Sequence, residues 1–168
     1  MPKGRLSFLK EYIMKIVTIK NELLNKYSGD PEMLQKSTRP CVLIIRLKYR
    51  DHSYDFAVPI RSNIPASAPK EQYFALPPRP QTRSRNHHGI HYIKMFPVTK
   101  QYLVRYRTEG NAFATLIQNV IDKNSKQIVI DCQRYLDLYA DGIRSAYATD
   151  IEYLIEQLNK KDVTEVTV

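Results

Sequence analysis

The sequence is poor in the features that mark membrane, secreted and cysteine-rich metal-binding proteins. It has no tryptophan, only two cysteines, and no apolar run near the roughly 18–20 residues that a membrane helix needs. Cys41 and Cys132 lie in separate apolar segments without a CxxC pair, which argues against a disulfide framework or a cysteine metal site. Charged residues interrupt the N-terminal segment and no small-residue cleavage site follows, so a signal peptide is not expected. The composition predicts a cytoplasmic protein.

Acidic residues are scarce in the middle of the chain. Residues 70–107 contain eight Lys/Arg and one acid, Glu71, whereas residues 108–168 contain ten acids and six Lys/Arg. The net charge of +9 is therefore carried by the first two thirds of the sequence. Charge segregated in this way indicates a face that meets a polyanion. A solvated basic loop is the alternative interpretation.

Hydrophobic spacing predicts strands first and helices afterwards. Strands are expected at 15–19, 41–48, 54–60, 90–96 and 103–106, with a hairpin turn at 49–53. Helices are expected at 20–27, 111–122, 126–140 and 150–160. Asn111 is the expected N-cap of the second helix, Gly142 ends the third, and Thr149 with Glu152 forms a capping box for the fourth. This order predicts an α+β fold with a mainly antiparallel sheet.

Residues 62–89 differ in composition from the rest. Prolines recur at positions 65, 69, 77, 78 and 80, among Ser, Arg, Asn and His. Each proline fixes φ and removes a hydrogen-bond donor, so we expect no long regular element there. A connection of this length inside a compact domain is uncommon and is often functional.

The basic region lacks the carboxylate clusters that a metal-dependent nuclease needs, and His87, His88 and His91 lack a fourth ligand or a helical spacing. No metal or other cofactor is therefore expected. RNA offers another route, because its own 2′-OH can attack the adjacent phosphate. The protein must then position the backbone, move a proton and neutralise charge in the transition state.

Residues suited to that chemistry follow an apolar strand directly. Arg61 offers a bidentate fork to phosphate, Ser62 can donate or relay a proton, and Asn63 can do either. His87 and His88 titrate near neutrality and could shuttle protons. An ordinary polar turn and a pair of surface histidines are the alternatives.

Four blocks, in this order, resemble a known family. They are Met14–Ile19, the step Arg39-Pro40 into an apolar strand, the hairpin that closes on Ala57-Val58-Pro59-Ile60-Arg61-Ser62, and the glycine-led block from Gly89 to Val98. Amphipathic helices follow at the expected spacing. The sequence from Met14 onward is similar to the ToxN/AbiQ family of endoribonuclease toxins from type III toxin–antitoxin systems, which has CptN/TenpN-like relatives.

The resemblance implies a compact, highly twisted, MazF/Kid-like sheet with an SH3-like barrel core and added C-terminal helices. It implies metal-independent cleavage of RNA that leaves a 2′,3′-cyclic phosphate and a 5′-OH. Ser62 matches the family's active-site Ser/Thr, and Arg39 matches a basic residue at the start of the second strand. Two positions depart from the family pattern, because Ile64 stands where a Lys is common and Gln35 where a Tyr is common. Arg61 is the expected functional replacement for that Lys.

The resemblance also implies a partner, a small repeat-derived antitoxin RNA with a pseudoknot fold, bound in a closed protein–RNA assembly. The catalytic candidates are Ser62, Arg61, Arg39 and Asn63. The RNA-binding candidates are Arg79, Arg83, Arg85, Asn86, His87, His88 and Lys94. We expect the segment from Arg79 to His88 to be extended or mobile when free, and to become ordered along the RNA backbone.

Two other functions remain open. A non-catalytic RNA-binding module of SH3-like shape would use the same charge pattern. A DNA-binding regulator is disfavoured, because no predicted helix is basic enough to enter a major groove. Residues 14–168 are expected to form one domain after an N-terminal extension at 1–13, with no membrane contact.

Overall fold

The computed structural model describes residues 14–161, so the extension predicted at 1–13 lies outside the described residues. The strands and helices, in chain order, are β1 (Ile16–Ile19), α2 (Asn21–Lys26), β2 (Cys41–Tyr49), β3 (His52–Ile64), β4 (Tyr73–Leu76), β5 (His87–His91), β6 (Phe96–Val98), β7 (Leu103–Arg105), α3 (Ala112–Lys123), α4 (Ser125–Ala140) and α5 (Ile151–Asn159). Three short 3-10 turns lie at Lys70–Gln72, Tyr92–Lys94 and Lys100–Tyr102. The fold is α+β, as the sequence predicts.

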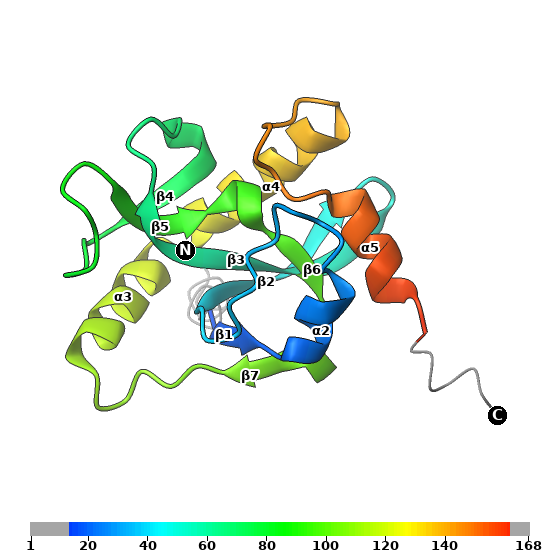
Figure 1. The fold of residues 1–168 in the computed structure, drawn as a ribbon. Helices are drawn as coiled ribbons and strands as arrows, with labels where there is room; N and C mark the ends of the chain where they lie inside the picture. The colour runs from blue at the N-terminus through cyan, green and yellow to red at the C-terminus, as the bar shows by residue number, and fades with distance from the viewer. Residues whose placement is uncertain (1–13, 162–168) are drawn as a thin grey trace, which may run out of the picture.

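The strands form one seven-stranded sheet in the order β4-β5-β3-β2-β1-β7, with β6 paired to β3 (Figure 1). Every pairing is antiparallel. The outermost strands of this order, β4 and β7, do not pair with each other among the described residues, so the sheet stays open. The long strand β3 contacts β2, β5 and β6 and therefore connects the two halves of the sheet.

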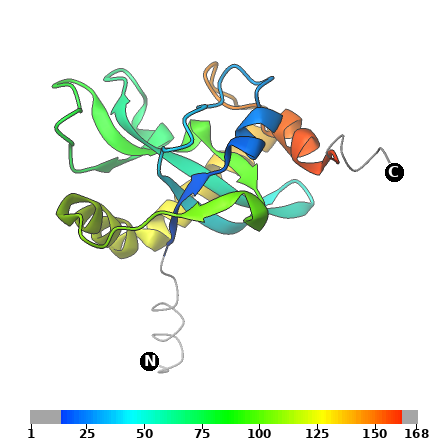
Figure 2. The same cartoon turned by 60° about the horizontal axis from the view of Figure 1, so that its bottom comes forward.

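Helices cover both faces of the sheet, and each face has its own core. One core joins β2, β3 and β5 to apolar residues of α3 and α4, including Ile121 and Ile128. The other joins β1 and β6 to α2 and α5, including Leu23 and Leu154. The two views of the ribbon show α3 and α4 on one side, and α2 with α5 on the other (Figures 1 and 2). The buried stripes at helical spacing explain why these helices could be predicted.

Two of the predicted helix boundaries are confirmed. The side chain of Asn111 accepts a hydrogen bond from the backbone N–H of Ala114, which caps the start of α3. At the end of α4, Gly142 has a φ of 89°. The N–H of Gly142 donates to the carbonyl of Tyr139, and the N–H of Ile143 donates to that of Leu138, which is the Schellman arrangement.

The capping box predicted from Thr149 and Glu152 is wrong. Asp150 is the N-cap of α5 and accepts from the N–H of Tyr153. Thr149 is fully buried, and its hydroxyl donates to the carbonyl of Met95 at 2.5 Å. Glu152 accepts hydrogen bonds from the β2–β3 hairpin instead. Thr149 and Glu152 therefore bind residues that are distant in sequence, and do not form the local capping box.

The strand boundaries after residue 60 also differ from prediction. Strand β3 continues to Ile64, and the segment expected to be irregular contains β4. The single strand predicted at 90–96 is divided into β5, a 3-10 turn and β6. Polar residues at the start of β5 obscure the apolar pattern of this strand in the sequence. Its pairing with β3 and β4 involves residues that are distant in sequence, so no local pattern predicts it.

Candidate functional site

A β-bulge places the candidate catalytic residues at the end of β3. Arg61 pairs with Gly89 and Ile64 pairs with His87, so Ser62 and Asn63 together lie opposite the single residue His88. A bulge adds a residue to one strand and redirects its side chains, and bulges are frequent next to active sites. Ser62 and His88, which the sequence indicated separately, are thus brought opposite each other across the β3–β5 ladder.

Close packing of β4 on β5 fixes the partner side of this bulge. Gly89 pairs with Ala75 of β4, and a Cβ atom at position 89 would lie 2.5 Å from the carbonyl oxygen of Phe74. A side chain there would force the two backbones apart. Glycine at position 89 is therefore required for the close packing of β4 on β5, which places the neighbouring His88 opposite the bulge.

The Ser62 hydroxyl is held by the loop that follows β4. Nη1 of Arg79 donates to Ser62 Oγ at 2.9 Å. Because this bond occupies a lone pair of the oxygen, the hydroxyl proton is left to point at a ligand. Arg79, predicted as an RNA contact, therefore also orients the candidate catalytic serine.

The same loop is anchored to β3 by Asn63. Its Oδ1 accepts from the backbone N–H of Arg83 at 2.8 Å, and its Nδ2 donates to the carbonyl of Gln81 at 3.0 Å. A turn also links the N–H of Asn86 to the carbonyl of Arg83. The expectation of an extended free loop is thus corrected, because Asn63 folds the loop back onto the strand. In this structure Asn63 acts on the loop, while its predicted catalytic role remains a prediction.

His88 is positioned as a proton acceptor. Its Nδ1 lies 2.7 Å from the carbonyl oxygen of Pro77 and its ring stacks on Phe113. A carbonyl only accepts, so Nδ1 carries the proton and Nε2 of the neutral ring keeps its lone pair. Burial lowers the pKa of His88 below 6.5, and the charge of Arg79 acts in the same direction. The ring is therefore neutral at pH 7.

Beside the bulge lies a group of side chains, here termed the cationic cluster, composed of Arg39, Arg61, His91 and Lys94. Nη1 of Arg61 donates to Nδ1 of His91 at 3.0 Å. Burial and the charges of Arg61 and Lys94 lower the pKa of His91 to about 3, so its ring is neutral. Burial also lowers the pKa of Arg61, with a further contribution from the nearby charge of Arg39.

The cationic cluster contains more positive charge than the protein neutralises. Lys94 is 7% exposed and pairs with Glu32 at 3.4 Å. Within residues 14–161, no acidic side chain forms an ion pair with Arg39 or Arg61. The buried Nε of Arg39 also has no hydrogen-bond partner there. Partly buried cations without a counter-ion favour an anionic ligand.

The predicted RNA-binding residues are placed in different environments. Arg83 and Arg85 are exposed on the loop after β4. His87 stacks on Tyr73, with ring centroids 5.0 Å apart. Lys94 is buried in the cationic cluster, which leaves it far less accessible than the two arginines.

Sequence reasoning missed the positions of His91 and Arg79 in the site. His91 was considered only as a metal ligand, and Arg79 only as an RNA contact. Extending the predicted strand back to residue 87 would have placed His87, Gly89 and His91 on one face and His88 on the other. No local signal predicts that Arg79 returns to Ser62.

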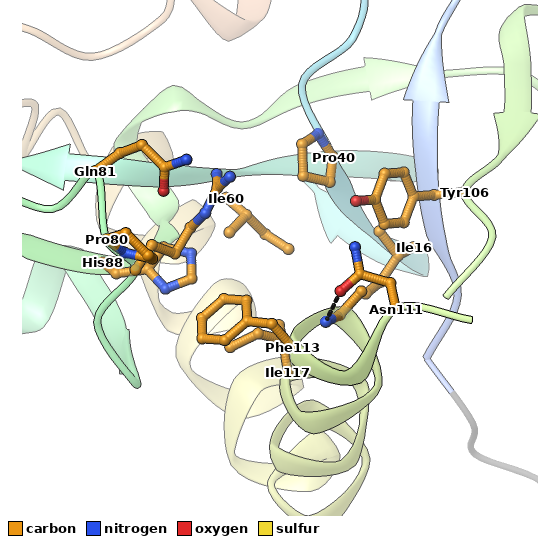
Figure 3. A pocket seen from close by; sticks show the side chains of 12 residues that line it. Ile16, Pro40, Ile60, Pro80, Gln81, His88, Tyr106, Asn111, Phe113 and Ile117 are labelled. Atoms are coloured by element: carbon orange, nitrogen blue, oxygen red, sulfur yellow. Dashed lines mark hydrogen bonds between the residues drawn. The ribbon is translucent and has the colours of Figure 1, made fainter. Parts of the chain in front are cut away.

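A cavity of about 210 Å³ opens between the end of β3, the loop at 79–81 and the start of α3 (Figure 3). Ile60, Arg79, His88, Tyr106 and Phe113 are among its lining residues. A second cavity of about 360 Å³ lies at the loop, and His88 lines it as well.

Residues 14–161 contain neither a metal-binding cluster of side chains nor a helix that could span a membrane. No group of three or more His, Cys, Asp or Glu side chains is arranged to hold a metal ion. None of the described helices combines the length and apolarity that a membrane crossing requires. Cys41 and Cys132 are both buried and unpaired.

No protein-family model and no curated protein matches the sequence, but solved structures do match the fold. AbiQ, a lactococcal anti-phage endoribonuclease of a type III toxin–antitoxin system, has a TM-score of 0.65 at 12% identity, over 86% of this chain and 95% of AbiQ. A protein from a type III system in which a non-coding RNA pseudoknot selectively inhibits the toxin has a TM-score of 0.65 at 16% identity, over 86% and 95%.

A third protein belongs to a bacterial antiviral system regulated by a processed non-coding RNA. It has a TM-score of 0.63 at 15% identity, over 86% of this chain and 97% of its own. The resemblance to ToxN/AbiQ proteins is therefore confirmed at the level of the fold.

Proposed function

We propose that this protein is an endoribonuclease toxin of a type III toxin–antitoxin system and that a small structured RNA inhibits it. The observation that carries the proposal is the bulge at Ser62. It brings the Ser62 hydroxyl and the neutral ring of His88 to the end of β3, next to Arg61, which has no acidic partner among the described residues. The shared fold supports the same conclusion, because AbiQ is an anti-phage endoribonuclease.

The proposed reaction is an attack of the RNA 2′-OH on the adjacent phosphorus. Nε2 of His88 accepts the 2′-OH proton as the O2′–P bond forms and the bond from phosphorus to the 5′ oxygen breaks. The leaving 5′ oxygen takes a proton from water. The hydroxide left by that water then takes the proton from His88, which regenerates the neutral ring. The products are a 2′,3′-cyclic phosphate and a 5′-OH, so atoms and charge balance without another reactant.

Ser62, Arg61 and Arg39 stabilise the transition state in this scheme. Ser62 Oγ donates to a non-bridging phosphate oxygen, while the guanidinium groups neutralise the charge that develops there. His91 is a positioning residue, because its neutral ring holds Arg61 rather than contacting the RNA. These roles need no metal ion.

The inhibitory RNA is proposed to bind along the loop that carries Arg83 and Arg85. Both side chains are exposed, and the loop lies next to the bulge. An RNA bound there would cover Ser62, so inhibition and substrate binding would use neighbouring surfaces. One of the proteins that share the fold comes from a type III system in which a non-coding RNA pseudoknot inhibits the toxin, and this supports the choice of partner.

The deciding experiment is incubation of the purified protein with single-stranded RNA in excess EDTA, followed by mapping of the product ends. We expect cleavage with 2′,3′-cyclic phosphate and 5′-OH termini, and cleavage slowed by about 10²–10³ with Ser62→Ala. Intact RNA that nevertheless binds the protein would instead identify a non-catalytic RNA-binding module. Cleavage only after addition of Mg²⁺ would reject the mechanism.

A further inference from the structure

We propose that the cavity of about 210 Å³ beside Ser62 binds one nucleobase of the substrate, and that this base selects the bond to be cleaved. The inference rests on the proposed ribonuclease function and adds the place where its sequence preference resides. It concerns a base-binding site, whereas the bulge and the cationic cluster act on phosphate.

The dimensions and lining of the cavity suit one flat ring. Pockets for drug-sized ligands are about 300–1,000 Å³, so a volume of about 210 Å³ suits a smaller group. Tyr106 and Phe113 lie on different sides of the opening, and Pro40 and Ile60 complete the apolar wall (Figure 3). Proteins bind unpaired bases by stacking them on such aromatic side chains.

The cavity adjoins the groups proposed to act on the phosphate. Arg79 lines it and also donates to Ser62 Oγ at 2.9 Å, and His88 lines it while lying opposite Ser62 in the bulge. A base seated here would therefore bring its own phosphate to the serine. The positive charge of Arg79 in the cavity wall matches a nucleotide rather than an uncharged aromatic ligand.

Few polar groups at the cavity are available to read a base edge. Oδ1 of Asn111 is used to cap α3, and Nδ1 of His88 is used by Pro77. The exposed side chain of Gln81 makes no hydrogen bond with the described residues, and its amide offers both a donor and an acceptor. Nδ2 of Asn111 and the hydroxyl of Tyr106 also make no hydrogen bond with the described residues, but of these side chains only the exposed Gln81 presents a donor and an acceptor side by side. Gln81 is therefore the residue that we assign to distinguish one base from another.

The test uses short 2′-O-methyl RNA strands that contain one unmodified ribonucleotide, so that only one bond can be cleaved. The base of that ribonucleotide, or of the next one, is varied through the four natural bases and an abasic unit. The wild type should favour one base at one of the two positions and cleave more slowly with the abasic unit there.

Tyr106→Ala removes a stacking surface and should lower kcat/KM for the preferred base by roughly 5- to 150-fold, with little change for the abasic strand. Gln81→Ala should keep the difference between base and abasic strands but reduce discrimination among the four bases. Because Tyr106 also packs against the core, Tyr106→Phe serves as a conservative variant that retains the ring. Tyr147→Ala is the matched control, since that ring is 69% exposed.

Equal base-to-abasic ratios for wild type and Tyr106→Ala would overturn the inference, even if every variant cleaves RNA. If the wild type cleaves no RNA at all, the proposed function fails instead. Fluorescence anisotropy with the same strands then decides the base site separately. Tighter binding of the base-containing strand that disappears in Tyr106→Ala supports the site, and an unchanged difference rejects it.

Discussion

Ser62 is oriented by its neighbours across the fold rather than by its own strand, because the bulge turns it and Arg79 holds its oxygen. Replacing it with alanine should lower kcat by about 10²–10³, the usual effect of removing one transition-state donor. RNA affinity should change little, since one neutral hydroxyl adds little to a polyanion contact. Single-turnover cleavage and filter binding measure the two effects. Ser53→Ala in the β2–β3 hairpin is the control. If Ser62→Ala keeps the kcat of the wild type, Ser62 has a structural role only.

The proposed role of His88 as general base predicts a defined pH dependence of RNA cleavage. A general base works only when it is deprotonated, so kcat/KM should fall as the pH drops through the lowered pKa of His88. The inflection should lie below 6.5, and the rate should be level at neutral pH. His88→Gln should remove the inflection and cost about 10²–10⁴ in rate. Rate measurements from about pH 4.5 to 8 test this, with exposed His52→Gln as the control; an inflection that survives in His88→Gln would assign the base elsewhere.

At the scale of elements, Glu152 ties α5 to the β2–β3 hairpin and to the segment after α4. Its Oε1 accepts from Arg50, Tyr49 and Arg144 at 2.6, 2.8 and 3.2 Å, and these bonds lower its pKa to about 2. A lowered carboxyl pKa stabilises the fold above the ordinary value of 4.5, and this contribution disappears as the pH falls toward 2.

We therefore expect Glu152→Gln to lower the free energy of unfolding at pH 7 by no more than about 1 kcal/mol, because the site is half exposed. The difference from wild type should shrink between pH 4.5 and 2, which urea unfolding at several pH values can follow. Glu156→Gln, on an exposed position of the same helix, is the matched control. A difference that stays constant with pH would mean that the three bonds contribute no charge-dependent stability.

The elements that the sequence predicts well are those whose signal is local. Apolar spacing located α3 and α4, and Asn111 and Gly142 marked their ends. The short strands β4 and β5 were missed or shifted because proline and histidine obscure them, and because their stability comes from pairing with β3. The region with the least local signal is also the one that carries the candidate site.

At the scale of the whole molecule, the segregated charge predicts how RNA binding responds to salt. Removing one cation that binds a phosphate should lower the salt slope of binding by about 0.7–0.9, so Arg83→Ala with Arg85→Ala should flatten it by about 1.4–1.8 and weaken affinity for a structured inhibitory RNA. Lys123→Ala with Lys126→Ala removes the same charge from the helices and should do much less. Binding isotherms at several salt concentrations distinguish the two double variants. An unchanged salt slope in the variant that lacks Arg83 and Arg85 would mean that the RNA contacts residues of the sheet instead.

The residues of the candidate site could be predicted from the sequence, but the hydrogen bonds between them could not. The sequence indicated Arg61, Ser62 and the histidines because polar residues followed an apolar strand. It could not indicate that Arg79 returns to Ser62, or that His91 holds Arg61, since these contacts span 17 and 30 residues. Such contacts depend on the sheet order, which no short window of sequence contains.

The position of β1 between β2 and β7 has a consequence for synthesis on the ribosome. This strand lies near the start of the chain, yet it pairs with β7, and Val17 lies opposite Arg105. Both edges of β1 are therefore satisfied only after Arg105 has left the ribosomal exit tunnel, and the bulge needs His88 before it can form. High sequence separation of this kind delays folding until most of the chain is available. A nascent chain cut short before β7 keeps an open strand edge and an incomplete sheet, so the sheet that carries the candidate site is complete only after β7 has been synthesised.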